Sequence, residues 1–316
     1  MKKVLFATTA LVATAGVASA EVALSGFAEM GIYSDGVAAA TDGTTDGAQF
    51  HNDIGITFTF SGETDNGLTF GAKFDIDDTN GSGMINGTPG MDSESVFVSG
   101  GFGTVTLGET DGAFDWAMSE VNVVGGSLAD DETAHAGFNG NAGLDGSNDD
   151  QILRYDYSFG AFGVAASLEM DDTTAADDIW GIGLTYDADM AGMQLGFGLG
   201  YQDGGTTYGD VTGVSVNAAM GNGFSAGINY SDMGLPGGVS GSHMGVGFGY
   251  ETGAIGVGVN YGEYDMPGAA ADSDGFGLAA TYDLGGGASM KFGYGSGSVG
   301  PAASVDTWSL GVAMSF

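Results

Sequence analysis

The last nine residues of the chain alternate strictly between large apolar and small side chains. From Trp308 to Phe316 the sequence reads WSLGVAMSF. Side chains of a β-strand point alternately to opposite faces, so this segment is a strand with one apolar and one minimal face. The pattern recurs along the chain, and nothing else in the sequence could form a second layer over those faces. A strand presents such a face to lipid only within a closed barrel, so we predict an all-β transmembrane antiparallel barrel.

The first twenty residues have the features of a cleaved export signal. Two lysines precede an apolar stretch from Val4 to Val17, and Ala18-Ser19-Ala20 is a small-residue cleavage site. We therefore expect residues 1–20 to be removed as a signal peptide and residues 21–316 to form a single barrel domain. The chain contains no cysteine, which excludes disulfides and thiol chemistry.

The chain is strongly acidic, with a formal net charge of −36 and only five Lys and Arg residues. Two of the five lie in the predicted signal peptide, which leaves Lys73, Arg154 and Lys291. Nucleic acid is excluded as a partner, because its binding depends on cations that neutralise phosphates. We expect divalent cations and other positively charged solutes as partners instead.

Alternating apolar residues and turn residues predict sixteen strands. They are Val22–Tyr33, Phe50–Ser61, Leu68–Ile76, Ser93–Gly100, Gly103–Gly108, Gln151–Ser158, Phe162–Met170, Trp180–Tyr186, Met193–Gln202, Val211–Met220, Phe224–Ser231, Met244–Tyr250, Ile255–Tyr264, Phe276–Leu284, Ser289–Gly295 and Val305–Phe316. Short turns alternate with longer connections rich in Asp and Gly, such as Asp232–His243. Short turns at one rim and long loops at the other are typical of outer-membrane barrels.

The apolar phase of each strand decides which side chains face the lumen. In three strands it turns the basic residues Lys73, Arg154 and Lys291 inward, together with Asp75 and Asp156. The other inward positions are mostly Gly, Ser, Asn and Thr, which cannot fill a sixteen-stranded barrel. We therefore predict a water-filled channel with these charged residues on its wall.

The connection from Glu109 to Asp150 is the longest, with ten acidic residues and no Lys or Arg. Loops of this length are usually functional or disordered. The functional interpretation folds it inward as a constriction, anchored by Phe114, Trp116, Met118 and Phe138. The acidic residues that we expect to narrow the channel are Glu109, Asp111, Asp115, Glu120, Asp130, Asp131 and Glu132. The alternative is a solvated external loop.

Several segments resemble the Gram-negative general porins, most of all the sixteen-stranded porins of purple bacteria and their alphaproteobacterial relatives. These segments are Glu21–Gly26 (EVALSG), Thr59–Phe70 (TFSGETDNGLTF), Gly101–Gly108 (GFGTVTLG), Tyr155–Ser167 (YDYSFGAFGVAAS) and Tyr282–Ala288 (YDLGGGA). The resemblance spans residues 21–316. It implies a homotrimer in the outer membrane that passes small hydrophilic solutes by diffusion, with the third external loop, Glu109–Asp150, folded inward.

One feature departs from the family pattern. The eyelets of these porins set wall arginines against the acidic loop, whereas the second predicted strand begins here with His51, Asn52 and Asp53. We therefore place His51 and Asp53 on the wall and predict a negative constriction that prefers cations.

Five Asp-Asp pairs lie in or beside the predicted loops. Calcium is bound by several carboxylate and carbonyl oxygens together. Asp130, Asp131, Asp149 and Asp150 are therefore candidates for a loop-stabilising Ca²⁺, and divalent ions are candidates for bridging the outer loops to lipopolysaccharide. The alternative is a solvated acidic rim, and no cofactor is required.

Catalytic motifs such as HExxH and GxSxG do not occur, and the three histidines are isolated, so we expect no enzyme activity. The alternatives to a diffusion porin are a substrate-specific outer-membrane channel, an occluded structural barrel or adhesin, and a secreted soluble β-protein. The channel interpretations place the protein in the outer membrane of a Gram-negative bacterium.

Overall fold

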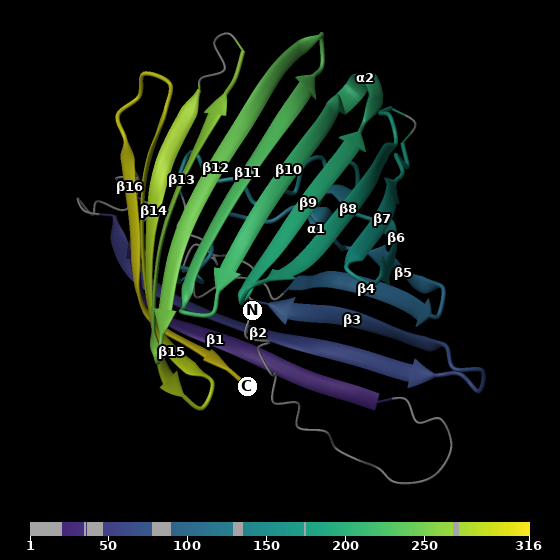
Figure 1. The fold of residues 1–316 in the computed structure, drawn as a ribbon, viewed down its shortest axis with the longest axis horizontal. Helices are drawn as coiled ribbons and strands as arrows, with labels where there is room; N and C mark the ends of the chain where they lie inside the picture. The colour runs from purple at the N-terminus through teal and green to yellow at the C-terminus, as the bar shows by residue number, and fades with distance from the viewer. Residues whose placement is uncertain are drawn as a thin grey trace.

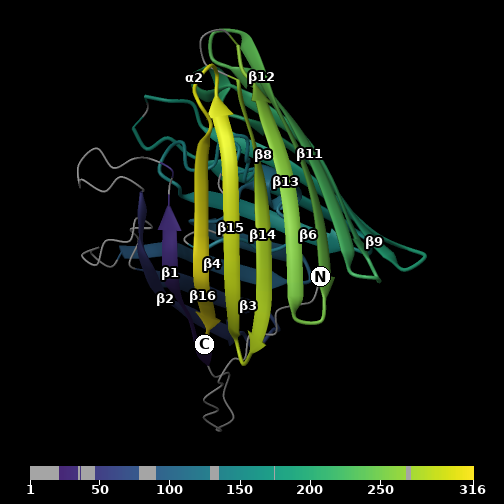
Figure 2. The ribbon, with the colours of Figure 1, turned by 90° about the vertical axis from the view of Figure 1, so that its left-hand side faces the viewer.

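The chain folds into one closed antiparallel β-barrel, which a computed structural model describes for residues 21–34, 36, 47–77, 90–128, 135–173, 175–267 and 272–316. Each strand pairs with its neighbours in the chain, and β1 pairs with β16 (Figures 1 and 2). The elements are β1 Glu21–Ser34, β2 Ala48–Glu63, β3 Thr69–Asp77, β4 Gly90–Gly100, β5 Gly103–Gly108, α1 Ala113–Ala117, β6 Ile152–Phe159, β7 Phe162–Glu169, β8 Ile179–Met190, β9 Met193–Asp203, α2 Gly205–Tyr208, β10 Asp210–Met220, β11 Phe224–Leu235, β12 Val239–Thr252, β13 Ile255–Asp265, β14 Ser273–Gly285, β15 Ala288–Val299 and β16 Val305–Ser315. The predicted sixteen-stranded barrel is confirmed.

The first and last strands close the barrel by direct pairing. Their register runs from Phe27 opposite Ser315 to Ser34 opposite Trp308. Phe316 and Gly26 also exchange two backbone hydrogen bonds, of 2.8 and 3.2 Å. The alternating C-terminal segment is therefore the strand that closes the sheet, so that no edge remains unpaired.

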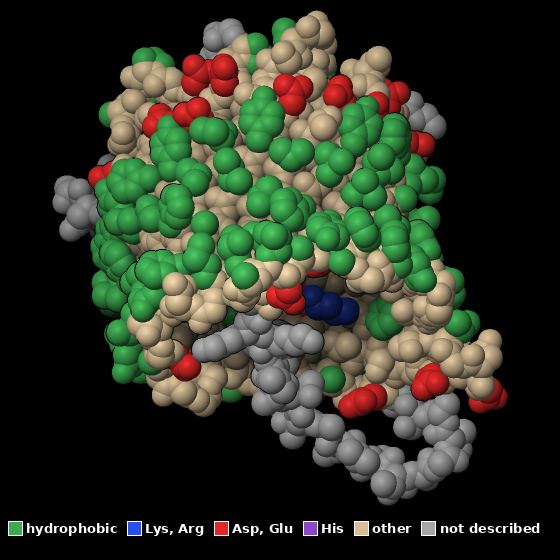
Figure 3. Space-filling model, in the orientation of Figure 1, with side chains coloured by type: hydrophobic (Ala, Val, Ile, Leu, Met, Phe, Trp, Pro, Cys, Tyr) green, Lys and Arg blue, Asp and Glu red, His purple; other side chains and the backbone are tan. Residues whose placement is uncertain are grey.

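Apolar side chains cover the outer face of the barrel (Figure 3). On β8, for example, Trp180, Ile182 and Leu184 are 44 to 49 % exposed, while the intervening Gly181 and Gly183 are buried. Such a continuous apolar surface is unusual for a protein in water and is typical of a strand that faces lipid. Within the described ranges, no helix combines the length and apolarity needed to span a membrane.

Several strands extend further than predicted. The composition of Asp232–His243 predicts a long connection, but β11 continues to Leu235 and β12 begins at Val239. Gly237 and Gly238 have φ angles of +88° and +77°, which glycine adopts at little cost, so the turn is tight. Strand β8 likewise extends beyond the predicted Tyr186 to Met190.

Candidate functional site: an interior lined by the β5–β6 connection

The connection between β5 and β6 runs along the inner face of the barrel wall, and we call its two described legs, residues 109–128 and 135–150, the loop band. Three wall serines hold the outward leg. The bonds run from Ala113 N–H to Ser167 Oγ on β7 (2.9 Å), from Ser119 N–H to Ser215 Oγ on β10 (3.0 Å) and from Leu128 N–H to Ser309 Oγ on β16 (3.0 Å). Ser215 is buried beside Val214, which is 46 % exposed on the opposite face. The outward leg therefore lies inside the barrel.

Glycines of the wall give the outward leg its seat. A Cβ atom added at Gly198 would collide with the Ala117 carbonyl oxygen, and one added at Gly247 with the Val121 carbonyl oxygen. Any larger residue would push the loop band off the wall. From the sequence we expected the inward glycines to line an open lumen. In the structure, several of them instead leave room for the backbone of the outward leg to pack against the wall.

Phe114 on α1 is the main apolar anchor of the outward leg. It is 1 % exposed and packs with Met118 and Val211, against Leu144 of the return leg and Met233 of β11. Of the four predicted anchors, Phe114 and Met118 are buried, whereas Trp116 and Phe138 are only half-buried.

The described part of the outward leg ends on the seam that closes the barrel. Leu128 is 2 % exposed, and its side chain lies over Gly31 of β1 and Gly311 of β16, which pair directly. A Cβ atom at either glycine would collide with Leu128 Cδ1. The loop band therefore contacts the first and the last strand at the same point.

Polar side chains of alternate strands hold the return leg. The contacts are His135 Nε2 with Asn260 Oδ1 on β13 (2.7 Å), Asn229 Nδ2 of β11 with Asn141 Oδ1 (3.3 Å), and Leu144 N–H with Gln202 Oε1 on β9 (2.7 Å). On β7, the Glu169 carboxylate accepts four backbone N–H bonds, from Gly146 (3.1 Å), Asn148 (2.9 Å), Asp149 (3.2 Å) and Asp150 (3.1 Å). Glu169 is 2 % exposed, and its strand-end position gave no signal of this role.

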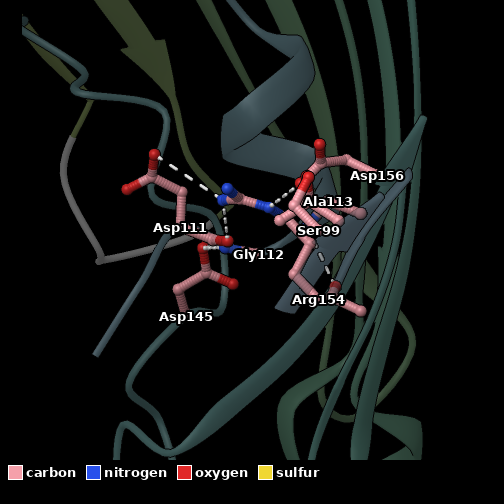
Figure 4. Close-up of polar contacts among 9 residues, drawn as sticks. Ser99, Asp111, Gly112, Ala113, Asp145, Arg154 and Asp156 are labelled. Atoms are coloured by element: carbon pink, nitrogen blue, oxygen red, sulfur yellow. Dashed lines mark hydrogen bonds and ion pairs between the residues drawn. The ribbon is translucent and has the colours of Figure 1, made fainter. Parts of the chain in front are cut away.

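Asp145 joins the two legs of the loop band near their root (Figure 4). Its carboxylate accepts the Gly112 N–H at 2.7 Å and the Gln202 Nε2 at 2.6 Å. Burial raises the pKa of Asp145 to about 6, although these two bonds oppose the rise. Burial, followed by the charges of Asp111, Asp145 and Glu120, also raises the pKa of Asp115 to about 7.

Arg154 lies at the same root and brings predicted wall and loop residues together (Figure 4). Its Nε is 3.3 Å from Asp156 Oδ1, and a terminal guanidinium nitrogen donates to the Asp111 carbonyl oxygen at 2.6 Å. The same nitrogen is 3.9 Å from the Asp111 carboxylate. Arg154 is thus held between two acids.

The other two basic side chains of the barrel also contact acids. Lys73 Nζ is 3.7 Å from Asp75 Oδ2 within β3. Lys291 Nζ on β15 is 3.3 Å from Glu29 Oε1 on β1, and His51 Nε2 on β2 is 3.4 Å from Glu29 Oε2. Asp53 lies opposite Glu29 in the β1–β2 register. Glu29 is the meeting point of this cluster, and the sequence analysis missed it because its partners are remote in the chain.

The remaining candidate residues are spread out. The Glu109 carboxylate accepts a hydrogen bond from the Ser93 N–H of β4 at 2.5 Å. Glu120 lines a hollow on the short-turn side of the loop band, the side called below the band from here on. Asp130, Asp131 and Glu132 lie outside the described residues. Within the described ranges, no three His, Asp or Glu side chains form a group able to hold a metal ion. The predicted Ca²⁺ site consists of Asp130, Asp131, Asp149 and Asp150. It stays a prediction, because Asp130 and Asp131 lie outside the described residues.

Two hollows of about 690 and 680 Å³ lie inside the barrel on the short-turn side of the loop band. Glu251 lines both of them. The second is also lined by Trp116, Glu120 and Asp187, and the first by Lys291. The interior below the band is therefore hollow and mostly acidic.

Comparisons with known proteins agree with this architecture. Residues 7–300 match a family described as Gram-negative porin. A porin of Rhodobacter capsulatus is 35 % identical over 153 residues, which are 47 % of this chain and 44 % of that porin, so the match spans less than half of the relative. A triple mutant of the Rhodopseudomonas blastica porin superposes with a TM-score of 0.70 at 22 % identity, over 93 % of this chain and 100 % of the other. A porin structure refined at 1.8 Å gives a TM-score of 0.66 at 26 % identity, over 94 % and 100 % of the two chains.

Proposed function

This chain belongs to the Gram-negative porin family and is an outer-membrane channel protein, and we propose that it passes ions and small hydrophilic solutes by diffusion with a preference for cations. Members of this family are channels rather than enzymes.

The charge on the inner wall carries the cation preference. Residues 21–316 contain only three Lys and Arg residues, and each of them contacts a carboxylate. Further carboxylates, Glu120, Asp187 and Glu251, line the hollow below the loop band, and Lys and Arg are absent from its lining. A wall that carries charge mostly of one sign and has a low dielectric constant concentrates counter-ions in the passage that it lines, so cations are favoured there.

We further propose that the loop band narrows the channel. It lines the wall from β7 to β16, whereas Lys73 and Asp53 lie on β3 and β2, outside that stretch. Solutes would pass between the band and this facing wall. Asp111, Asp115 and Glu120 would then give the narrow part its negative side.

Reversal potential in a planar bilayer under a salt gradient tests the proposal. The wild-type protein should give a cation-to-anion permeability ratio above one. The double variant Asp187→Asn, Glu251→Gln should lower that ratio, because it removes two carboxylates from the hollow. A matched variant, Glu63→Gln, Asp65→Asn, removes two exposed carboxylates at the β2–β3 turn and should leave the ratio unchanged. Anion preference of the wild-type protein would refute the proposal.

Assembly and surface partners are also proposals. The family resemblance supports a homotrimer, and conductance steps in groups of three would support it. Divalent cations, including Ca²⁺, would bridge the acidic outer connections to lipopolysaccharide. Loss of bound lipopolysaccharide after chelation is the expected result, and retention would contradict it.

A further inference from the structure

A separate small cavity lies between the loop band and the barrel wall, near the rim of the long connections. Its volume is about 250 Å³. The lining comes from both legs of the band and from the wall, through Phe114, Leu144, Val211, Ser231 and Met233. None of these residues lines the two larger hollows on the short-turn side. The cavity is therefore separate from both hollows, and its lining includes no residue of β2 or β3, the wall that faces the proposed solute path.

The body of the cavity is apolar. Phe114 and Val211 are 1 % and 6 % exposed, and Leu144 and Met233 pack against them. An apolar cavity of about 150 Å³ already binds benzene in another protein, because dry apolar walls gain contacts from an apolar guest. The larger space here is enough for one ring with a few further atoms.

One polar group in the lining lacks a hydrogen bond. Ser231 is 2 % exposed, and its Oγ has no partner among the described residues. A buried hydroxyl without a partner is unfavourable, and this hydroxyl is able either to donate or to accept. By contrast, the Tyr208 hydroxyl, also in the lining, lies 2.8 Å from Asn148 Oδ1 and 3.0 Å from the Ser147 carbonyl oxygen.

The charge of the lining limits the charge of a molecule that could bind in the cavity. Asp210 lies at the cavity, and no Lys or Arg belongs to its lining, so an anion would be repelled. A cation would lose its hydration against the apolar walls. An uncharged guest meets neither penalty.

We propose that this cavity binds a small uncharged amphipathic molecule of the phenol class, with its ring against Phe114 and Met233 and its hydroxyl bonded to Ser231 Oγ. Such a guest contacts both legs of the loop band and the wall together. By mass action, its binding stabilises the docked position of the band. This site goes beyond the proposed diffusion function and does not depend on ion preference.

Fluorine NMR of detergent-solubilised full-length protein, titrated with 4-fluorophenol, tests the proposal. We expect saturable binding to the wild-type protein, and no saturable binding for Met233→Trp, which fills the cavity. Fluorobenzene, which lacks the hydroxyl, should bind more weakly, and 4-fluorobenzoate should not bind at neutral pH. Heat-modifiable mobility on SDS gels confirms that each variant is a folded barrel.

Ser231→Ala isolates the hydrogen bond from the shape of the cavity. It should lower the affinity for 4-fluorophenol about three- to tenfold, the range expected for one hydrogen bond, and leave that for fluorobenzene unchanged. Ser225→Ala is the matched control, because Ser225 lies on the same inner face of β11 but lines the hollow below the band. Equal partitioning of 4-fluorophenol with wild type and Met233→Trp would overturn the site. An unchanged phenol-to-fluorobenzene preference in Ser231→Ala would overturn the role of Ser231.

Discussion

Glu169 offers the sharpest test of how the return leg is held against the wall. Its carboxylate is buried and accepts hydrogen bonds from four backbone N–H groups of the segment from Gly146 to Asp150. The substitution Glu169→Gln keeps the shape of the side chain and removes its charge. It therefore changes the bonding while leaving the packing of β7 intact.

The size of the effect follows from the individual bonds. Oε1 accepts three of the four N–H groups, and Oε2 accepts only Gly146 N–H. In the variant, the amide oxygen can replace Oε1, but the NH₂ group then faces the Gly146 N–H, so that one bond is lost and three lose their charge. A bond to a charged group contributes about 1.5 to 3 kcal/mol, and a neutral one about 1 kcal/mol. At the lower end of these ranges the loss is about 3 kcal/mol, so we expect docking of residues 146–150 to weaken on the order of a hundredfold or more.

Hydrogen exchange measured by mass spectrometry on peptides covering residues 146–150 is the assay. Exchange in Glu169→Gln should accelerate by about two orders of magnitude or more, while peptides of β10 and β11 keep their wild-type rates. Asp189→Asn removes the same charge from an exposed position of β8 and should change nothing at residues 146–150. A change of less than about threefold in Glu169→Gln would show that the carboxylate does not hold the return leg.

The other predictions concern the outward leg and the two perturbed carboxyl groups. Leu128→Ala should cost about 2 to 5 kcal/mol of docking energy at the end of the outward leg and make the bonds near Leu128 sensitive to protease in a barrel that remains folded, and wild-type cleavage rates there would contradict this. The pKa values of Asp115 and Asp145, about 7 and about 6, lie above the ordinary 3.8, so the folded protein binds the extra protons. Stability from these groups is therefore complete at low pH and lost as pH rises from about 4 to 7, and exchange of the loop band, corrected for intrinsic rates, should be faster at pH 8 than at pH 5. Cation preference should decrease from pH 8 to pH 5 as Asp115 gains its proton, and Asp115→Asn should reduce this pH dependence of the reversal potential, whereas an unaltered dependence would exclude Asp115 as its source.

The strands were predictable because the phase of their apolar residues reports directly on the lipid-facing side. That phase also turned Arg154, Lys73 and Lys291 inward, and all three contact acids within the sheet or its connection. The prediction failed where turn-forming composition masked a strand, as at Asp232–His243, where the inward Met233 continues β11. A single Pro-Gly-Gly turn was enough to hide the continuation.

The sequence could not reveal contacts that depend on sheet register. Glu169 accepts bonds from N–H groups about twenty residues earlier in the chain, and Glu29 contacts Lys291 across the closing seam, at a separation of 262 positions in the sequence. Neither pair has a local signature, because an inward acid on a strand has the same spacing in the sequence whether or not it has a partner. Ser167, Ser215 and Ser309 were missed for the same reason, since inward serines are typical of any hydrated wall.

The position of Leu128 over Gly31 and Gly311 has a consequence for the order of assembly. Its seat consists of one residue from the first strand and one from the last, so it does not exist until the two ends of the chain have met. Closing such a long loop carries an entropic cost that local contacts cannot repay early, so the seat forms late in folding. A barrel stalled before closure would therefore leave the Leu128 end of the outward leg undocked, although Ser167 and Ser215 could still hold its earlier part. Protease resistance close to Leu128 is thus a readout of completed closure. Because Gly31 and Gly311 together leave the space for Leu128, complete docking of the outward leg requires that the first and last strands have paired.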